Sequence, residues 1–150
     1  MIGQPLVSVI TAAYNAEAFI GETVASVQAQ TCQDWEMLIA DDASVDRTVE
    51  AVASAAAQDP RVHLIRLEQN GGVARARNAA LAEARGRYVA FLDSDDLWLP
   101  QKLERQIAFM KVQDAAVSYT AFRRINEDGS RVGRLVRVPA RLTYRQLLKN

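Results

Sequence analysis

The sequence predicts an α/β fold in which a mostly parallel sheet is flanked by helices. Short apolar, β-rich runs alternate four times with segments in which apolar residues recur at helical spacing. Glycine-containing turns and breaks in the apolar pattern separate these segments. At 150 residues and 49% hydrophobic content, the chain can bury one full core. Four βα units in series favour a largely parallel sheet with helices on both faces.

Each element has its own signal. The four strands are expected at Leu6–Ala12, Glu36–Ala40, Val62–Leu67 and Arg87–Leu92. Asn15 is the expected cap of the first helix, Gly86 the expected end of the third, and Pro100 suits the first turn of the fourth. The apolar stripes of the four helices are Phe19, Ile20, Val24 and Val27; Val45, Val49, Val52 and Ala56; Val73, Ala76, Ala80 and Ala84; and Leu103, Ile107 and Met110.

The last third of the chain has a different pattern. Ala115–Ile125 resembles a further strand, Asn126–Gly129 is a turn signal, and Arg131–Val138 resembles a returning arm. This pattern predicts an antiparallel hairpin or sheet edge near the C-terminus. A short helical pattern starts at Thr143 and runs to Asn150 without a stop signal. We therefore expect residues 1–150 to be a single domain that is truncated at its C-terminus.

Composition excludes several classes of protein. The 18 basic and 18 acidic residues give no overall basic field for nucleic acid or anionic lipid, although local clusters can still bind anions. The single cysteine, Cys32, cannot form an internal disulfide and fits a reducing cytoplasm. The sequence shows no apolar run of membrane-spanning length. We expect a cytoplasmic protein, or one peripheral to the inner face of a membrane, with no nucleic-acid partner.

An acidic run follows the fourth predicted strand. Asp93, Asp95 and Asp96 place three carboxylates within four residues. Such carboxylates repel one another unless a cation or a cationic ligand holds them together, which suggests a divalent metal site. A solvated turn that starts the next helix explains the same residues equally well.

Polar residues gather where the predicted parallel strands end. In such sheets the ligand crevice lies outside the carboxyl ends of the strands, and all strands end at the same edge. The residues at these ends are Thr11, Tyr14 and Asn15; Asp41 and Asp42; Glu68 and Asn70; and Asp93, Asp95 and Asp96. The sequence therefore predicts a polar binding site along one edge of the sheet.

Arg77 is a separate indication of an anion near this edge. On a helical wheel it falls within the apolar stripe of the third helix, whereas Arg75 points away. A guanidinium on a buried face needs an anionic partner, and Arg77 lies one turn from the helix start. A phosphate or the acidic run would suit it. The alternative is a side chain whose stem covers the core while its charged end reaches water.

Four segments together resemble the inverting family 2 glycosyltransferases, whose nucleotide-sugar-binding part has the Rossmann-like GT-A fold. They are residues 7–15 (VSVITAAYN), 39–48 (IADDASVDRT), 70–78 (NGGVARARN) and 91–96 (FLDSDD), in the family's order. The resemblance implies that Ala12, Tyr14 and Asn15 border the nucleotide and that Asp42, with Asp41 as a second contact, meets the base. It also implies that Arg77 lies near the diphosphate. Asp93 and Asp95 match the family's metal-binding Asp-X-Asp motif, with Asp96 as an alternative ligand, for Mg²⁺ or Mn²⁺.

The implied reaction moves a sugar from a nucleotide diphosphate to an acceptor hydroxyl, and it needs a carboxylate base. The acids after Asp96 are Glu104, Asp114, Glu127 and Asp128, and their contexts suggest structural or solvated roles. We therefore expect the base beyond Asn150. The sugar, the nucleobase and the acceptor, whether saccharide, lipid-linked or protein, stay open, as does the oligomeric state.

Other classes remain as alternatives. A nucleotidyltransferase would share the metal carboxylates but usually has an early glycine-rich phosphate loop, which this chain lacks. A nucleotide-binding or assembly module without turnover is also compatible with the motifs. A dinucleotide-dependent dehydrogenase would need glycines after the first strand, where residues 12–15 read AAYN. His63 and Trp98 are explained equally well or better by packing.

Overall fold

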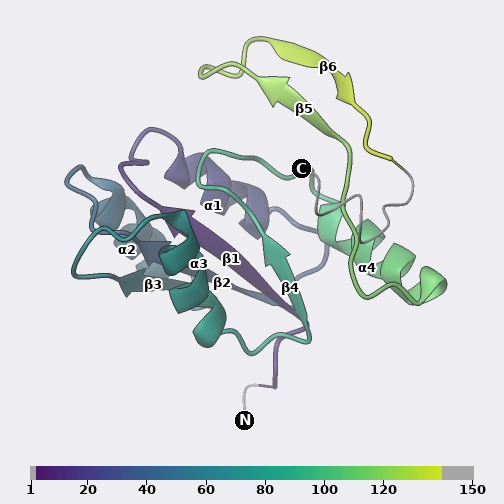
Figure 1. Ribbon diagram of the computed structural model, residues 1–150, viewed down its shortest axis with the longest axis horizontal. Helices are drawn as coiled ribbons and strands as arrows, with labels where there is room; N and C mark the ends of the chain where they lie inside the picture. The colour runs from purple at the N-terminus through teal and green to yellow at the C-terminus, as the bar shows by residue number, and fades with distance from the viewer. Residues whose placement is uncertain (1–2, 140–150) are drawn as a thin grey trace. The chain divides into compact units, whose positions relative to one another are not determined.

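The computed structural model describes residues 3–139, which form a four-stranded parallel sheet, four helices and a separate hairpin (Figure 1). The chain divides into two compact units, residues 1–105 and 106–150, with the boundary inside α4. The elements are β1 (Val7–Ala13), α1 (Ile20–Gln28), β2 (Trp35–Asp41), α2 (Thr48–Gln58), β3 (Val62–Arg66), α3 (Val73–Ala82), β4 (Tyr88–Phe91), α4 (Lys102–Gln113), β5 (Phe122–Ile125) and β6 (Val132–Val136).

The sheet has the strand order β3-β2-β1-β4, and all neighbouring strands in it are parallel. This arrangement confirms the predicted fold class. The chain moves from β1 to β2 to β3 in one direction and then crosses back to place β4 on the other side of β1. Right-handed crossovers therefore put α1 and α2 on one face and α3 on the opposite face. The reversal beside β1 is a topological switch point, the usual place for a ligand crevice in such sheets.

The core beneath α3 is built from β-branched and long aliphatic side chains of the sheet facing alanines of the helix. Ile10 and Leu38 pack with Ala76 and Ala80, and all four side chains are buried. Because alanine is small, the α3 backbone can approach the sheet closely, which fixes the helix start near the carboxyl ends of the strands.

The buried carboxylate of Glu36 connects neighbouring segments at the other end of the sheet, where the strands begin. Glu36 accepts hydrogen bonds from the Ser8 hydroxyl at 2.7 Å and from the Arg85 backbone and guanidinium. Burial opposes its ionisation, but these hydrogen bonds outweigh that cost and hold the pKa of Glu36 below its ordinary value. Gly86 lies against β1 here, where an added Cβ would come within 2.3 Å of the Ser8 nitrogen. Gly86 is therefore needed for close approach and is not the helix terminator that we predicted, since α3 ends at Ala82.

Three residues expected at the starts of helices differ from the prediction in position or burial. Asn15 does not cap α1, which begins at Ile20, because its side chain bonds to the next βα loop. Val45 precedes α2 and is 87% exposed, since the helix begins only at Thr48. Val73 is the first residue of α3, but its side chain is exposed. The buried stripes of α2 and α3 therefore begin later than predicted.

The second unit contains the predicted hairpin in shortened form. Phe122 pairs with Val136 and Ile125 with Val132, with an irregularity between these pairs. Residues 115–121 are not a strand, because the strand partner across the turn pairs only from Phe122 onward. The predicted turn is confirmed, with Gly129 at a φ of 69°. The helical pattern after Thr143 lies outside the described residues.

Candidate functional site

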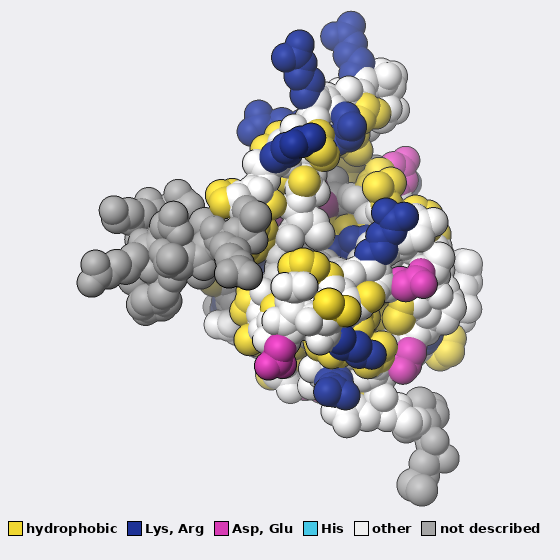
Figure 2. Space-filling view, turned by 90° about the vertical axis from the view of Figure 1, so that its right-hand side faces the viewer, with side chains coloured by type: hydrophobic (Ala, Val, Ile, Leu, Met, Phe, Trp, Pro, Cys, Tyr) yellow, Lys and Arg dark blue, Asp and Glu magenta, His cyan; other side chains and the backbone are white. Residues whose placement is uncertain are grey.

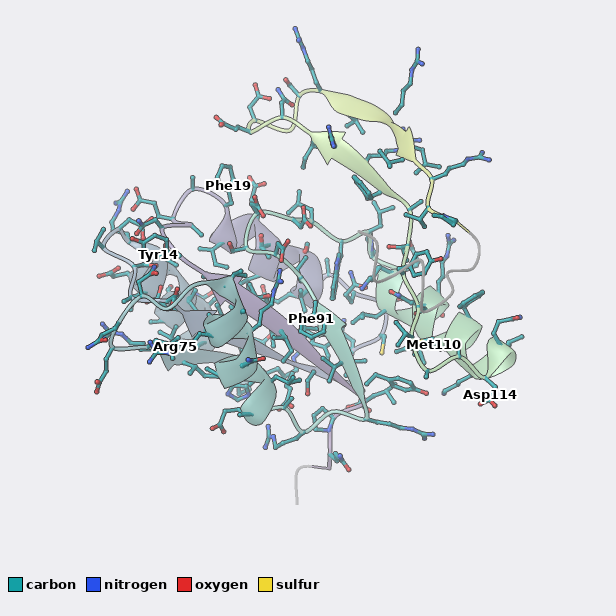
Figure 3. All side chains as sticks on the ribbon, in the orientation of Figure 1. Tyr14, Phe19, Arg75, Phe91, Met110 and Asp114 are labelled. Carbon is teal, nitrogen blue, oxygen red and sulfur yellow. The ribbon has the colours of Figure 1, made fainter. Side chains whose placement is uncertain are left out.

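The carboxyl ends of β1, β2 and β4 bring most of the predicted site residues to one edge of the sheet. Tyr14 follows β1 and is half exposed (Figure 3), Asp41 ends β2, and Asp93 lies two residues after β4. Val7 to Ala13 pair in register with Trp35 to Asp41, and Val7 to Ile10 pair with Tyr88 to Phe91. The shared register places the three following loops side by side, as the sequence predicted.

Asp42 fixes the glycine turn that leads into α3. Its two carboxylate oxygens accept hydrogen bonds from the backbone N–H groups of Gly71 and Gly72, at 2.9 and 2.7 Å. Gly72 has a φ of 85°, a conformation that residues with a Cβ rarely adopt. Asp42 is buried, so these bonds tie the end of β2 to the start of α3. Its predicted contact with a nucleobase stays a prediction.

One carboxylate oxygen of Asp41 receives no hydrogen bond from any described residue. Its Oδ2 accepts a hydrogen bond from the Ser44 backbone at 3.1 Å, while Oδ1 is buried without a hydrogen-bond partner among residues 3–139. Thr11 Oγ1, on the neighbouring strand, is in the same situation. Buried polar atoms are rarely left without a partner, so these two oxygens suit a ligand or an ordered water.

The loops after β1 and β2 are locked to each other by side-chain hydrogen bonds. Asn15 accepts from the Val45 backbone at 3.0 Å, and its own N–H donates to the Ser44 hydroxyl at 2.9 Å. Thr48 accepts from the Ala16 backbone at 2.7 Å. Asn15 and Ala43 both have positive φ values, 49° and 61°. Asn15 therefore shapes the loop, and its predicted place beside a nucleotide, like that of Ala12 and Tyr14, stays a prediction.

Arg77 and Asp93 form an ion pair between α3 and the acidic loop. Arg77 Nη2 lies 2.5 Å from Asp93 Oδ1, and their side chains are 37% and 54% exposed. Arg77 therefore lies at the margin of the buried face, less enclosed than the helical wheel predicted. One of the two partners proposed for it from the sequence, the acidic run, is the one it contacts.

The other two carboxylates of the acidic loop lie close enough to interact. Partial burial raises the pKa of Asp96, and the charges of Asp95 and Asp93 raise it further. Within residues 3–139 no three His, Cys, Asp or Glu side chains converge in a metal-binding group. Mg²⁺ and Mn²⁺ are commonly held by one or two carboxylates together with substrate phosphates. The chemistry of this donor set therefore fits such an ion without a complete protein cage.

Polar side chains of α1 and of Gln30, two residues after its end, hold the backbone of the acidic loop and of the segment after it. Thr23 donates to the Ser94 carbonyl at 2.9 Å, and the Ser26 hydroxyl accepts from the Trp98 backbone at 3.2 Å. Gln30 donates to the Leu99 carbonyl at 2.9 Å and accepts from the Leu103 backbone at 3.0 Å. Our sequence reasoning missed these three supports. The available signal was the spacing of Thr23 and Ser26, which puts these two polar residues beside the apolar stripe of α1, whereas Gln30 follows the helix.

The segment after the acidic loop is anchored by packing. Lys102 Nζ lies 3.5 Å from the centre of the Trp98 ring, and burial lowers the pKa of this lysine to about 8. Trp98 is partly buried, which favours the anchoring role over the sugar contact that was its alternative. His63 lies within β3 and is also partly buried.

Residues 8–150 match the sequence family described as Glycosyl transferase family 2. A glycosyltransferase assigned to teichuronic acid biosynthesis in Bacillus subtilis (strain 168) is 47% identical over 147 residues, covering 98% of this chain and 58% of the relative. An Escherichia coli protein named UDP-Glc:alpha-D-GlcNAc-diphosphoundecaprenol beta-1,3-glucosyltransferase is 44% identical, covering 97% of this chain and 56% of the relative. The chain thus spans little more than half the length of these proteins.

Solved structures show the same architecture. Staphylococcus aureus TarS in complex with UDP-GlcNAc matches with a TM-score of 0.67 and 32% identity, over 72% of this chain and 32% of that chain. A Pyrobaculum calidifontis mannosyltransferase in complex with GDP-Man and Mn²⁺ matches with a TM-score of 0.66 and 28% identity, over 79% of this chain and 34% of that chain. The fold is thus that of the GT-A glycosyltransferases. The chain belongs to glycosyl transferase family 2.

Proposed function

We propose that this chain forms the donor-binding part of an inverting glycosyltransferase that uses a uridine diphosphate sugar and a divalent metal ion. The observation that carries the proposal is the convergence of Asp41, Arg77 and the acidic loop at the switch point of a family 2 fold. Uridine is supported by the relative that is named for UDP-Glc and by the TarS complexes with UDP and UDP-GlcNAc.

Asp41 is our candidate for reading the nucleotide. Its buried Oδ1 is an acceptor without a partner among the described residues, and the uracil ring carries an N–H donor. A site that hydrogen-bonds a ligand donor discriminates against analogues that lack it, because its own buried oxygen would then be left unpaired. Tyr14, half exposed at the same edge, is the candidate for packing against the base or the ribose.

Arg77 and the acidic loop are the candidates for the diphosphate side of the donor. A guanidinium can bind phosphate and carboxylate oxygens through parallel N–H groups, so Arg77 can serve the diphosphate and Asp93 in turn. Asp95 and Asp96 would then hold the metal ion, with Asp93 joining them when Arg77 turns to phosphate. A bound Mg²⁺ or Mn²⁺ supplies neutralisation of the charge that develops on the departing diphosphate.

The acceptor and the catalytic base complete the proposal. None of the four acids after Asp96 is placed as a base: Glu104 accepts from the Thr31 hydroxyl at 2.6 Å, and Asp128 accepts from the Ser130 backbone within the hairpin turn. Asp114 directly follows α4, and Glu127 lies in the same turn as Asp128. We therefore propose a base outside this set. A saccharide linked to a lipid diphosphate is the favoured acceptor, by similarity to the Escherichia coli relative.

A thermal-shift panel tests donor binding directly, because a ligand that binds the folded state raises the melting temperature. We expect stabilisation by UDP with Mn²⁺, less by UDP with a chelator, and less again by GDP or uridine. Stabilisation by GDP that equals that by UDP would contradict the base assignment. Absence of any nucleotide effect would refute the function. Turnover of UDP-Glc to free UDP in the presence of acceptor would exclude the alternative of a binding module without catalysis.

A further inference from the structure

A set of hydrogen bonds joins the loops that follow β1 and β2. On the face shown in Figure 2, charged side chains instead project outward among hydrophobic ones, and no helix within residues 3–139 is long and apolar enough to cross a membrane. The polar groups of the two loops are directed at each other. We call the hydrogen bonds between residues 13–17 and residues 41–48 the loop lock.

Three successive backbone N–H groups of the first loop each donate to a side-chain oxygen from the second loop or the start of α2. The pairs are Asn15 with the Ser44 hydroxyl at 2.9 Å, Ala16 with the Thr48 hydroxyl at 2.7 Å, and Glu17 with an Asp46 carboxylate oxygen at 3.1 Å. In return, two N–H groups of the second loop donate to side chains of the first. Neither loop can therefore shift without breaking several hydrogen bonds at once.

Tyr14 lies between two connections of the loop lock. The Ala13 carbonyl before it accepts a hydrogen bond from the Asp42 N–H at 2.8 Å, and the Asn15 N–H after it donates to Ser44. The backbone on both sides of Tyr14 is thus fixed to the segment that directly follows Asp41. The lock therefore limits where the exposed Tyr14 ring can lie relative to the end of β2.

Ser44 connects Tyr14 with the Asp41 carboxylate. Its backbone N–H donates to Asp41 Oδ2 at 3.1 Å, while its hydroxyl accepts from the Asn15 N–H. Because Oδ2 is engaged in this way, Oδ1 is the oxygen of Asp41 that has no partner among the described residues. Ser44 thus contacts both of the segments that carry our candidates for reading the nucleotide.

Thr48 supports the second loop from a fully buried position at the start of α2. Its hydroxyl donates to Asp46 Oδ1 at 2.5 Å while it accepts from the Ala16 N–H. Burial opposes the ionisation of Asp46, but hydrogen bonds from Thr48 and from the Glu17 backbone outweigh that cost and hold the pKa of Asp46 below its ordinary value. Asp46 is therefore a charged acceptor of the lock at neutral pH.

The backbone conformation of the lock is costly at two positions. Asn15 and Ala43 have positive φ values, 49° and 61°, which most residues with a Cβ avoid. Such conformations persist where surrounding contacts hold them, and they are common at ligand sites. Asn15 follows Tyr14 by one position and Ala43 follows Asp41 by two, so the lock compensates strain beside both candidates.

We propose that Ser44 and Thr48 are positioning residues for the nucleotide, because their hydroxyl groups hold Tyr14 and Asp41 in one arrangement before a ligand binds. The inference rests on the proposed function, in which Asp41 and Tyr14 contact the base or the ribose. A site that adopts its binding geometry only part of the time binds its ligand more weakly in proportion. A preformed site also loses less conformational freedom on binding.

The alternative is a lock that serves only the fold, since its bonds lie at the starts of α1 and α2. Ser44→Ala separates the two readings, because it removes the hydroxyl and keeps the N–H that donates to Asp41. We expect UDP binding with Mg²⁺, measured by isothermal titration, to weaken about 5- to 10-fold, the factor of one net hydrogen bond. Inorganic pyrophosphate carries the diphosphate charge without base or ribose, so its affinity should be the same in both chains.

Thr48 provides a conservative pair of variants. Thr48→Val should weaken UDP binding as Ser44→Ala does, whereas Thr48→Ser retains the hydroxyl and should stay within about twofold of the unmodified chain. The matched control is Ser8→Ala, which removes a buried hydroxyl at the other end of β1, between Glu36 and Gly86. It should lower the melting temperature and leave UDP affinity unchanged. Equal loss of UDP affinity in the Ser8 and Ser44 variants would assign the effect to general stability and overturn the inference.

Amide hydrogen exchange in the ligand-free chain checks the loop lock without any nucleotide. Ser44→Ala and Thr48→Val should speed exchange in residues 14–17, and unchanged exchange there would overturn the inference. Faster exchange with unchanged UDP affinity would show that the lock serves only the fold, and would leave the proposed function standing. Absence of UDP binding by the unmodified chain would refute the proposed function and the inference together.

Discussion

Arg77 on α3 and Asp93 after β4 form an ion pair with 2.5 Å between Nη2 and Oδ1, across the point where the order of the strands reverses. α3 is the crossover from β3 at one edge of the sheet to β4 at the other, so its first turns pass over the carboxyl ends of β2 and β1. The pair therefore connects the helix that would face a diphosphate with the loop that would hold a metal ion. Several predictions about donor binding depend on this connection.

Arg77→Met should weaken binding of UDP about 10- to 100-fold and leave binding of uridine nearly unchanged. A hydrogen bond to a charged group contributes about 1.5–3 kcal/mol. UDP would lose such a bond between the guanidinium and a phosphate, whereas uridine has no phosphate and would lose none. Isothermal titration with both ligands measures the difference. Arg75→Met is the matched control, because Arg75 is on the same helix and exposed. Equal losses for UDP and uridine would make Arg77 a structural residue.

Asp95→Asn should remove the dependence of UDP binding on Mn²⁺ while the melting temperature without ligand stays the same. Asp95 is exposed, so replacing its charge with an isosteric amide leaves the packing intact. Thermal shifts with UDP, with and without Mn²⁺, provide the measurement. Asp34→Asn, at an exposed position before β2, should keep the metal effect. Persistence of the metal effect in Asp95→Asn would rule out Asp95 as a ligand.

Gln30→Leu should lower the free energy of unfolding by about 2–4 kcal/mol, because buried groups would lose their hydrogen bonds. The groups affected are the Ser26 and Leu99 carbonyls and the Leu103 N–H. We also expect faster amide hydrogen exchange in residues 94–103, the segment that α1 and Gln30 support. Gln58→Leu, at an exposed position on α2, is the control and should change stability little. Unaltered exchange in this segment would contradict the supporting role of Gln30.

Ala43→Gly should stabilise the protein by about 0.5–1 kcal/mol. The φ of 61° at Ala43 is costly for a residue with a Cβ, and glycine removes that cost although it adds freedom to the unfolded chain. Urea denaturation measures the effect. Ala55→Gly, in the interior of α2, should instead destabilise by about 1 kcal/mol. A loss at Ala43 as large as that at Ala55 would show that the positive φ stores no strain.

The ion pair between Asp59 and Arg61 should make stability depend on pH in the acid range. Hydrogen bonding from Arg61 lowers the pKa of Asp59 from 3.8 to about 2. A carboxyl group whose folded-state pKa is depressed stabilises above its unfolded pKa. That contribution is therefore full above about pH 4 and is lost as the pH falls to about 2. The difference corresponds to about 2 kcal/mol.

Comparing Asp59→Asn with the unmodified chain isolates this contribution. The variant should be less stable at pH 7, and the difference should be largely lost at pH 2, where the Asp59 carboxyl group of the unmodified chain is about half protonated in the folded state and almost fully protonated in the unfolded state. Urea denaturation at both values gives the two free energies. The exposed Asp34→Asn serves as control and should show no such convergence. A constant difference at both pH values would assign the effect to packing.

The periodicity of the sequence was sufficient for the sheet, because strand and helix patterns depend on which side chains are buried in each element. It failed at element starts, where contacts from distant loops decide. Asn15 is a residue type that often caps helices, yet its side-chain oxygen accepts a hydrogen bond from the backbone N–H of Val45, thirty residues away. Gly86 follows a helix, yet the close approach of β1 is what requires it. Neither partner can be inferred from the local pattern.

The sequence alone determined the four βα units, the edge at which polar residues gather, the hairpin near the C-terminus and the family resemblance that the comparisons confirm. These follow from local spacing and short motifs. Only the tertiary structure decided which charges pair and which stay unpaired. In the folded chain Arg77 pairs with Asp93, and both carboxylate oxygens of Asp42 accept hydrogen bonds from the glycine turn. Asp41 Oδ1 has no partner among the described residues. Hydrogen bonding acts over a few ångströms in space, and sequence separation does not encode those distances.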